Sequence, residues 1–323
     1  MRIRSLRWLL GAAAVPLMWM MPAPAQAAAI GAAFSSIYTL SLLPAPFGGP
    51  NYNLGGLAFE AGNSNVLMIG GGSDTSAATL QGVTVTRDPV FLNVTGFSGS
   101  STLATSPDVD GGIAYGPGGV LFFTQYTDNT VGELKPGSVS PDKTIALPGV
   151  ITSTGGLAFI PAGFPGAGNA AITSFNGQTI CSAPVTADGF GTYDFGTCAN
   201  TVSFGTTIEG IQYVPLGTPG FSAPSILVDL YSSGSTGQVV AYTLDSNGMP
   251  VLGSATPLLT GLGTAEGITI DPVTGDFLIS EFTPLHNVYE VHPTTQAALG
   301  APEPGTWSLI AVALIGLGCR LRR

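Results

Sequence analysis

Gly55-Gly-Leu-Ala-Phe59 is the segment that best indicates the fold, because the chain repeats it. The further copies are Gly111-Gly-Ile-Ala-Tyr115, Gly155-Gly-Leu-Ala-Phe159, Glu209-Gly-Ile-Gln-Tyr213 and Glu266-Gly-Ile-Thr-Ile270. The second glycine of each copy stands at position 56, 112, 156, 210 or 267, so the spacings are 56, 44, 54 and 57 residues. Repeats at such a period predict a modular architecture with one small structural unit per copy.

Each copy is followed by a turn and two more apolar segments that are typical of short strands. We expect the second strands of the units at 66–69, 120–123, 170–173, 226–228 and 277–279. The third strands are expected at 80–86, 131–134, 179–185, 239–244 and 288–291. The turn Asp271-Pro-Val-Thr-Gly-Asp276 is typical of a connection between two such strands, since proline fixes φ and glycine allows a positive φ.

Repeated units of four short strands predict an all-β fold, a β-propeller with five blades, and residues 30 to 45 are expected to supply the closing strand. A sixth, degenerate blade stays open because some spacings are long for one blade. The alternative is a two-sheet β-sandwich in which the glycine pairs are coincidental. The short motif and the turn resemble those of propellers of the NHL and SMP-30/gluconolactonase type.

The N-terminus has the three parts of a secretory signal peptide. Arg2, Arg4 and Arg7 form a basic region, an apolar region follows from Trp8 to Met21, and Ala25-Gln26-Ala27 supplies a small-x-small cleavage site. We therefore assign residues 1–27 to a signal peptide, with signal peptidase cutting before Ala28; an uncleaved membrane anchor is the alternative.

The C-terminus also carries an apolar segment, which a basic cluster follows. Twelve uncharged residues, 307–318, would span about 18 Å as a helix, which is short for a bilayer core that needs about 20 apolar residues. The positive-inside rule places Arg320, Arg322 and Arg323 in the cytoplasm and the body outside. Pro302-Glu303-Pro304 is expected to be extended and open to a processing enzyme, because proline and the residue before it resist helix.

This order of Pro-Glu-Pro, apolar helix and arginine cluster resembles the PEP-CTERM sorting signal of bacteria that make exopolysaccharide. The resemblance covers residues 301–323 and implies recognition by an exosortase and removal of the helix. The 28–300 body would pass through an inner-membrane intermediate to the cell surface or extracellular matrix of a Gram-negative bacterium. Exopolysaccharide or other surface proteins would then be its partners. An ordinary C-terminal anchor is the alternative.

The composition of the body limits its partners. Only Arg87, Lys135 and Lys143 are basic between the two terminal signals, whereas eighteen of the nineteen acids lie there, so the body carries fifteen net negative charges. Nucleic acid is excluded as a partner, because phosphate binding requires a basic footprint. Such a surface suits solubility and the binding of divalent cations.

Cysteine usage fits an exported protein. Cys181 and Cys198 are the two cysteines of the body, and we expect them to form a disulfide worth about 3 kcal/mol on the chain-entropy model. In a propeller, Cys181 would lie on a third strand and Cys198 on or near the fourth. Two free buried thiols are the alternative.

The usual catalytic motifs are absent from the sequence. It contains no G-x-S-x-G elbow, phosphate loop, dinucleotide fingerprint or C-x-x-C. His286 and His292 could act as ligands or a general base, but isolated surface histidines are the more common interpretation. We therefore predict no catalytic residue.

One pattern does suggest a metal site. Glu209 and Glu266 replace the first glycine of the repeated motif, and the resemblance to gluconolactonase-type propellers implies that a Glu-Gly pair there supplies a carboxylate to a divalent cation in the central channel. Asp229, Gln125 and Glu281 fall just after second strands, near the same rim. These oxygen ligands would suit Ca²⁺; solvated or backbone-capping acids are the alternative. Asp108-Val-Asp110-Gly111 and Asp245-Ser-Asn247-Gly248 are interpreted as turns, because neither has an EF-hand glutamate downstream.

Three functions fit these observations. The first, which the missing catalytic motifs favour, is an exported non-catalytic propeller that binds or organises the extracellular polysaccharide matrix. The second is a divalent-metal-dependent lactonase or hydrolase that works in the propeller channel. The third is a protein-interaction platform on one propeller face.

Overall fold

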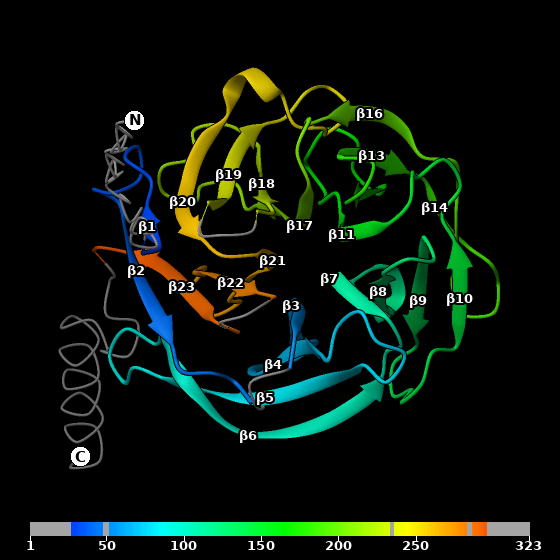
Figure 1. Ribbon diagram of the computed structural model, residues 1–323, viewed down its shortest axis with the longest axis horizontal. Helices are drawn as coiled ribbons and strands as arrows, with labels where there is room; N and C mark the ends of the chain where they lie inside the picture. The colour runs from blue at the N-terminus through cyan, green and yellow to red at the C-terminus, as the bar shows by residue number, and fades with distance from the viewer. Residues whose placement is uncertain (1–26, 48–51, 233–235, 283–285, 296–323) are drawn as a thin grey trace, which may run out of the picture.

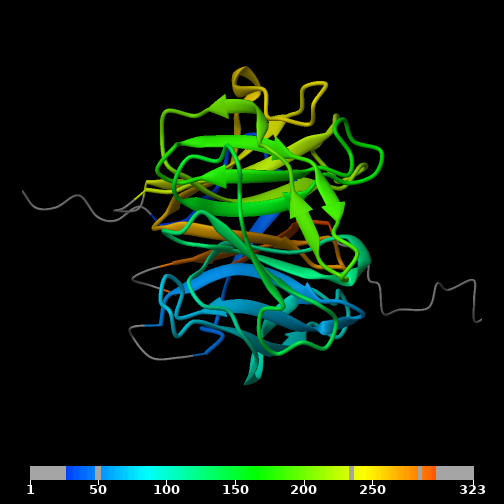
Figure 2. The same cartoon turned by 90° about the vertical axis from the view of Figure 1, so that its right-hand side faces the viewer.

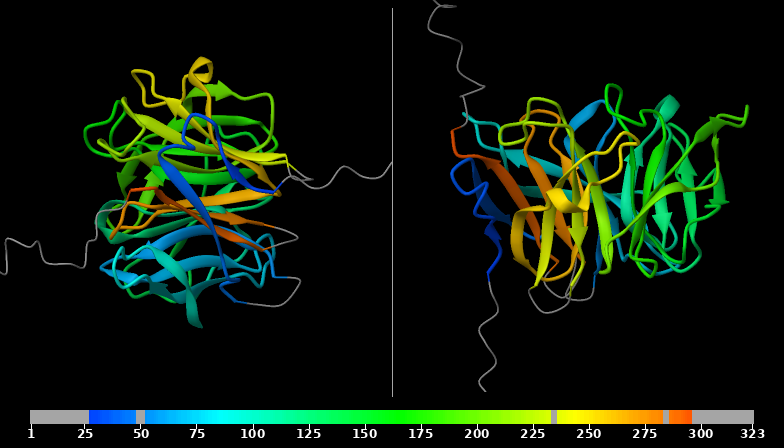
Figure 3. Two further views of the ribbon diagram at one scale, coloured as in Figure 1. Left: turned by 90° about the vertical axis from the view of Figure 1, so that its left-hand side faces the viewer. Right: turned by 90° about the horizontal axis from the view of Figure 1, so that it is seen from above.

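Five antiparallel sheets are arranged as blades around a central axis in the computed structural model, which describes residues 27–47, 52–232, 236–282 and 286–295 (Figure 1). The strands run between the two faces of the ring, as the edge-on views show (Figures 2 and 3). The predicted five-bladed propeller is therefore confirmed, the sandwich is excluded, and the described residues hold no sixth blade.

Each blade begins with one copy of the repeated motif as its innermost strand. Blade 1 contains β3 (Leu54–Glu60), β4 (Asn63–Gly71), β5 (Thr79–Arg87) and β6 (Val94–Thr105). Blade 2 contains β7 (Val109–Tyr115), β8 (Leu121–Gln125), β9 (Thr130–Leu134) and β10 (Lys143–Ala146). Blade 3 contains β11 (Thr154–Phe159), β12 (Ala170–Ser174), β13 (Thr179–Ala183) and β16 (Ala199–Ser203).

The last two blades use strands from both ends of the chain. Blade 4 contains β17 (Ile208–Val214), β18 (Ser225–Leu230), β19 (Gly237–Thr243) and β20 (Thr256–Leu262), with β1 (Ala29–Ile30) added outside. Blade 5 contains β21 (Ala265–Ile270), β22 (Phe277–Glu281), β23 (Val288–Pro293) and, as the outermost strand, β2 (Tyr38–Leu43). The predicted closing strand is thus confirmed as β2, and β1 is an addition that the sequence did not reveal.

Blade 3 also departs from the expected pattern. The hairpin β14 (Val185–Ala187) and β15 (Tyr193–Phe195) is inserted before its fourth strand, so the predicted third strand ends two residues early. Cys181 on β13 is bonded to Cys198, which directly precedes β16, and the predicted disulfide is confirmed. Helix is confined to two short 3₁₀ turns, Pro117–Gly119 and Leu252–Ser254, among the described residues.

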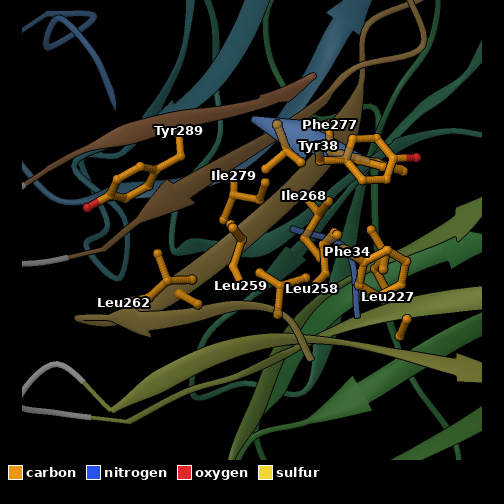
Figure 4. Packing of buried hydrophobic residues seen from close by; sticks show 14 of the residues in the cluster. Phe34, Tyr38, Leu227, Leu258, Leu259, Leu262, Ile268, Phe277, Ile279 and Tyr289 are labelled. Atoms are coloured by element: carbon orange, nitrogen blue, oxygen red, sulfur yellow. The ribbon is translucent and has the colours of Figure 1, made fainter. Parts of the chain in front are cut away.

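The apolar residues of the strands form five separate cores, one between each pair of neighbouring blades. Figure 4 shows the core between blades 4 and 5, where Leu258 and Leu259 of β20 face Ile268 and Phe277 of blade 5. Phe34 and Tyr38, from the segment that closes the ring, complete this core. Hydrophobic burial therefore stabilises both the blades and the closure of the ring.

In the part of the chain that the structure describes, no helix is long and apolar enough to span a bilayer. The predicted signal peptide, 1–27, lies outside the described residues except for Ala27, and so does the sorting signal, 301–323.

Candidate functional site

The innermost strands bulge where the repeated motif begins. On β17, Ile208 pairs with Leu230 and Ile211 pairs with Val228, so two residues of the inner strand stand opposite one. Bulges of this kind re-aim side chains and are common beside functional sites. Here the bulge of β17 contains Glu209.

The bulge on β7 is one residue longer and brings in an acid that the sequence pattern had assigned to a turn. Val109 pairs with Gln125 and Ile113 pairs with Phe123, so 110–112 stand opposite Thr124 alone. Asp110 therefore follows Val109 as Glu209 follows Ile208, and the turn interpretation of Asp110 is wrong. Counting from the apolar residue before each motif, rather than from its glycine pair, would have revealed this equivalence.

Three carboxylates meet at this level of the channel. Asp110, Glu209 and Glu266 each offer an oxygen atom, and these oxygens all lie within 4.8 Å of one another. The three residues are only 2, 3 and 2% exposed. The other two inner strands carry glycine at this level, and a Cβ atom on Gly155 would lie 2.3 Å from Glu209 Oε2. Glycine on blade 3 thus makes room for the carboxylate of blade 4.

The cluster forms the floor of a pocket of about 170 Å³. Its remaining lining residues are one acid and four aromatic residues, namely Asp74, Tyr126, Phe175, Tyr231 and Phe282. We call these four aromatic residues the rim. Each rim residue directly follows the second strand of its blade, after β8, β12, β18 and β22. Blade 1 has Gly72 at that position instead, and its loop brings Asp74 to the pocket.

The rim is a second repeat that the sequence predictions did not include. The segments Thr124-Gln-Tyr126, Thr173-Ser-Phe175, Asp229-Leu-Tyr231 and Ser280-Glu-Phe282 share one pattern, a polar residue two positions before an aromatic residue. This pattern could have been found by aligning the ends of the predicted second strands.

Three of the four polar residues of this second repeat, Thr124, Thr173 and Ser280, join neighbouring blades by hydrogen bonds. Thr173 Oγ1 accepts a hydrogen bond from Gly156 N at 2.5 Å and donates to the Glu209 carbonyl at 2.9 Å. Ser280 Oγ likewise accepts from Gly267 N at 3.1 Å and donates to the Gly55 carbonyl at 2.8 Å. Asp229 occupies the same position in blade 4, where burial raises its pKa well above the ordinary range. Both carboxylate oxygens of Asp229 are buried without a hydrogen-bond partner among the described residues, and Asp229 is not one of the three clustered acids.

Burial and mutual repulsion determine the protonation of the cluster. Burial, and then the charges of neighbouring acids, raise the pKa values of Asp110, Glu209 and Glu266 well above the ordinary range. Asp110 and Glu266 are hydrogen-bonded side chain to side chain, which requires a proton on one of them. Without a cation, burial and mutual repulsion therefore favour the protonated forms of the floor acids.

The same charges act on the side chains above the floor. Burial, with the charge of Asp108, raises the pKa of Asp74 to about 7. Burial and the four carboxylates of the pocket raise the pKa of Tyr231 to about 12. The floor, Asp74 and the rim therefore form one electrostatic unit.

No basic side chain of the body neutralises these acids, because all three are engaged elsewhere. Arg87 forms an ion pair with Asp271, Lys135 with Asp142, and Lys143 with Asp188 and Asp194. Two buried floor atoms, Asp110 Oδ2 and Glu209 Oε2, have no hydrogen-bond partner among the described residues. Only protons or an added cation can compensate the charge of the floor.

The sequence thus identified two of the three floor residues, Glu209 and Glu266. Glu281 is bonded instead to Gly263 N and to Asn287 Nδ2, and Gln125 Nε2 donates to the Pro107 carbonyl. Neither side chain lines the pocket. His286 and His292 also lie outside the pocket lining.

Comparison with known proteins assigns no function to this chain. No protein-family model and no curated protein sequence match the chain. A calcium structure from Trichoderma reesei, of Carbohydrate-Active Enzymes family AA12, is 11% identical with a TM-score of 0.47, over 85% of this chain and 98% of that one. Glutaminyl cyclase from Myxococcus xanthus is 13% identical with a TM-score of 0.45, over 79% and 96% of the two chains.

A putative gluconolactonase is 12% identical with a TM-score of 0.41, over 83% of this chain and 99% of that one. At such identities and scores, these proteins assign no activity to this chain.

Proposed function

We propose that this protein is an exported propeller that binds a divalent cation, Ca²⁺, in its channel and uses the bound ion to hold an external ligand. The observation that carries the proposal is the floor of the pocket, where three buried carboxylate oxygens lie within 4.8 Å of one another. No basic side chain of the body reaches them.

The residues present fit such an ion. Ca²⁺ prefers oxygen ligands at about 2.3–2.6 Å, so two ligands of one ion lie at most about 5 Å apart. The floor oxygens satisfy this limit. Asp110 Oδ2 and Glu209 Oε2 have no hydrogen-bond partner among the described residues and are available to coordinate the ion. Glu266 would give up the proton shared with Asp110, because metal ligands must be deprotonated.

The structure also suggests which side of the ion would face a ligand. The three acids belong to inner strands, whereas the rim stands at the mouth of the same pocket. A Ca²⁺ ion takes six to eight oxygen ligands, and three carboxylates alone leave positions for ligand oxygens or water. The chain's own residues would orient that ligand, with Asp74 and the rim around it.

Asp74 favours a second candidate, a metal-dependent hydrolase or lactonase. Asp74 lines the pocket, but it is not one of the three acids whose oxygens are clustered. A carboxylate with a pKa of about 7 beside a bound ligand is suited to proton transfer near neutral pH. The test is lactone hydrolysis by the unaltered protein and by Asp74→Asn. Hydrolysis that is lost in the variant while its Ca²⁺ affinity is retained would favour this candidate over simple binding.

Calorimetric titration of Ca²⁺ tests the main proposal. We expect one ion per chain, and a loss of affinity on the order of tenfold or more in Glu209→Gln, because affinity depends on the charge of the ligand set. Asp128→Asn is the matched control, since it removes one carboxylate from an exposed turn. An unchanged affinity in Glu209→Gln, or the absence of binding heat in the unaltered protein, would contradict the proposal.

The two terminal segments support export and sorting to the cell surface or polysaccharide matrix. Replacement of Pro302, Glu303 and Pro304 by alanine should prevent removal of the tail in the native host. The mass of the mature protein measures this directly, and normal processing of the variant would overturn the exosortase assignment.

A further inference from the structure

The rim is the part of the pocket that cation binding at the floor does not explain. Tyr126, Phe175, Tyr231 and Phe282 come from four different blades and are all half-buried around one opening. The rings of Phe175 and Tyr231 pack edge to face, with centroids 5.1 Å apart. This contact fixes part of the rim in the absence of any ligand.

The charge of the pocket determines which kind of ligand the rim can bind. Four carboxylates line the pocket, Asp74 in addition to the three floor acids. A divalent ion would compensate two of these charges and leave the mouth negative when Asp74 is ionised. The faces of aromatic rings are also negative, so both features attract a cation and disfavour an anionic ligand.

The size of the pocket limits the group that enters. Pockets for drug-sized ligands have volumes of about 300–1,000 Å³, whereas this one has about 170 Å³. It can therefore take one head group of a larger molecule. Several aromatic side chains around a small negative cavity are the kind of arrangement by which proteins recognise ammonium groups.

We propose that the rim and Asp74 bind the ammonium group of an organic ligand, above the cation held by the floor. This inference rests on the proposed function because it uses the same pocket, but it depends on different side chains. The ligand class is an alkylammonium compound or a sugar that carries a free amine. A neutral sugar or alcohol of the same shape would lack the attraction to Asp74 and to the ring faces.

Matched ligands test the proposal without knowledge of the natural one. Choline and its uncharged analogue 3,3-dimethylbutan-1-ol have nearly the same shape, and glucosamine differs from glucose by its amine. Each would be titrated calorimetrically into the Ca²⁺-loaded protein at pH 7.5. We expect the charged member of at least one pair to bind about tenfold or more tightly than its neutral partner.

Variants locate the binding to the rim. Tyr231→Leu keeps an apolar side chain but removes a ring face, and Asp74→Asn removes the charge; each should weaken binding of the charged ligand about tenfold. Phe190→Leu is the control, because this ring is 83% exposed at the tip of the β14–β15 hairpin. Thermal unfolding and Ca²⁺ titration of every variant would separate loss of folding or of the floor site from loss of the rim.

The outcomes distinguish the two proposals. Ca²⁺ binding with no preference for the charged member of either pair would overturn the ammonium site and leave the metal site intact. Equal affinities of Tyr231→Leu and Phe190→Leu for the charged ligand would overturn the ammonium site as well. Charged-ligand binding without any Ca²⁺ binding would support the rim and overturn the proposed metal site.

Discussion

The two mouths of the channel are made from opposite ends of the same five inner strands, yet they differ in chemistry. The ends where β7, β17 and β21 begin hold the buried acids and the rim. The ends where the strands finish form a hollow of about 260 Å³. It is lined mainly by apolar residues such as Phe59, Tyr115 and Ile270, by the polar residues Gln212 and Thr269, and by no charged residue. Identical topology therefore does not produce the acidic site, which depends on the residues placed in the bulges.

The difference also shows how glycine and acid complement each other. Blades 1 and 3 have Gly55 and Gly155 in the bulge, whereas blades 2, 4 and 5 have an acid there. Five carboxylates at one level would leave no free space, because the single Cβ of an alanine at Gly155 would already collide with Glu209. The glycines are thus part of the site.

Filling that space should have the largest effect on the acidic mouth. Gly155→Ala should displace the Glu209 carboxylate and lower Ca²⁺ affinity on the order of tenfold or more, as measured by calorimetry. Gly253→Ala is the matched control, because a Cβ atom there meets nothing within 4 Å. Gln212→Leu, at the opposite mouth, should leave the affinity unchanged. Equal Ca²⁺ affinities in all three variants would contradict the claim that only the acidic mouth binds the ion.

A smaller effect is expected from pH on the protein without Ca²⁺. Acids whose pKa is raised on folding stabilise the fold when protonated, and this stability is lost as pH rises through the folded pKa. Asp74 and Glu133 have pKa values of about 7, and Glu290 has one of about 8. The temperature of half-unfolding should therefore decrease as the pH is raised from about 5 to about 8.5.

Ca²⁺ should reverse part of this loss. Its binding displaces protons from the floor, so the increase in unfolding temperature that Ca²⁺ causes should grow as the pH rises. Glu133 and Glu290 lie on the third strands β9 and β23, outside the pocket lining, and their contribution should not respond to Ca²⁺. A Ca²⁺ effect that is the same at pH 5.5 and pH 8 would contradict the protonated floor.

The fold could be predicted well from the sequence because each copy of the repeat marks the innermost strand of one blade. The glycine motif, the apolar segments and the turn residues indicated the five inner strands and the closing strand, and the two cysteines of an exported body indicated the disulfide. The hairpin of blade 3 and β1 were missed, since β1 is only two residues long and the hairpin is a local insertion without a counterpart in other blades. Ring closure by β2 was predictable because the last repeat has only three expected strands of its own, and β2 supplies the fourth.

The site was predicted less completely, for reasons that lie in single residues. Glu209 and Glu266 were found because they interrupt a run of glycines, whereas Asp110 was hidden by the additional glycine in its bulge. Asp229 and Glu281 lie near the ends of second strands, but Asp229 is packed against Gly210 of the inner strand of its own blade and Glu281 is hydrogen-bonded to Asn287. Which way a side chain points at the end of a strand depends on the register of the bulge, and sequence spacing alone does not specify it.

A crystal structure of the protein grown with Ca²⁺ would show whether the floor is a metal site. We predict one ion in the channel, with oxygen atoms of Asp110, Glu209 and Glu266 at about 2.3–2.6 Å from it. Density for water alone between these carboxylates at saturating Ca²⁺, or an ion bound only at other acids of the surface, would contradict the prediction.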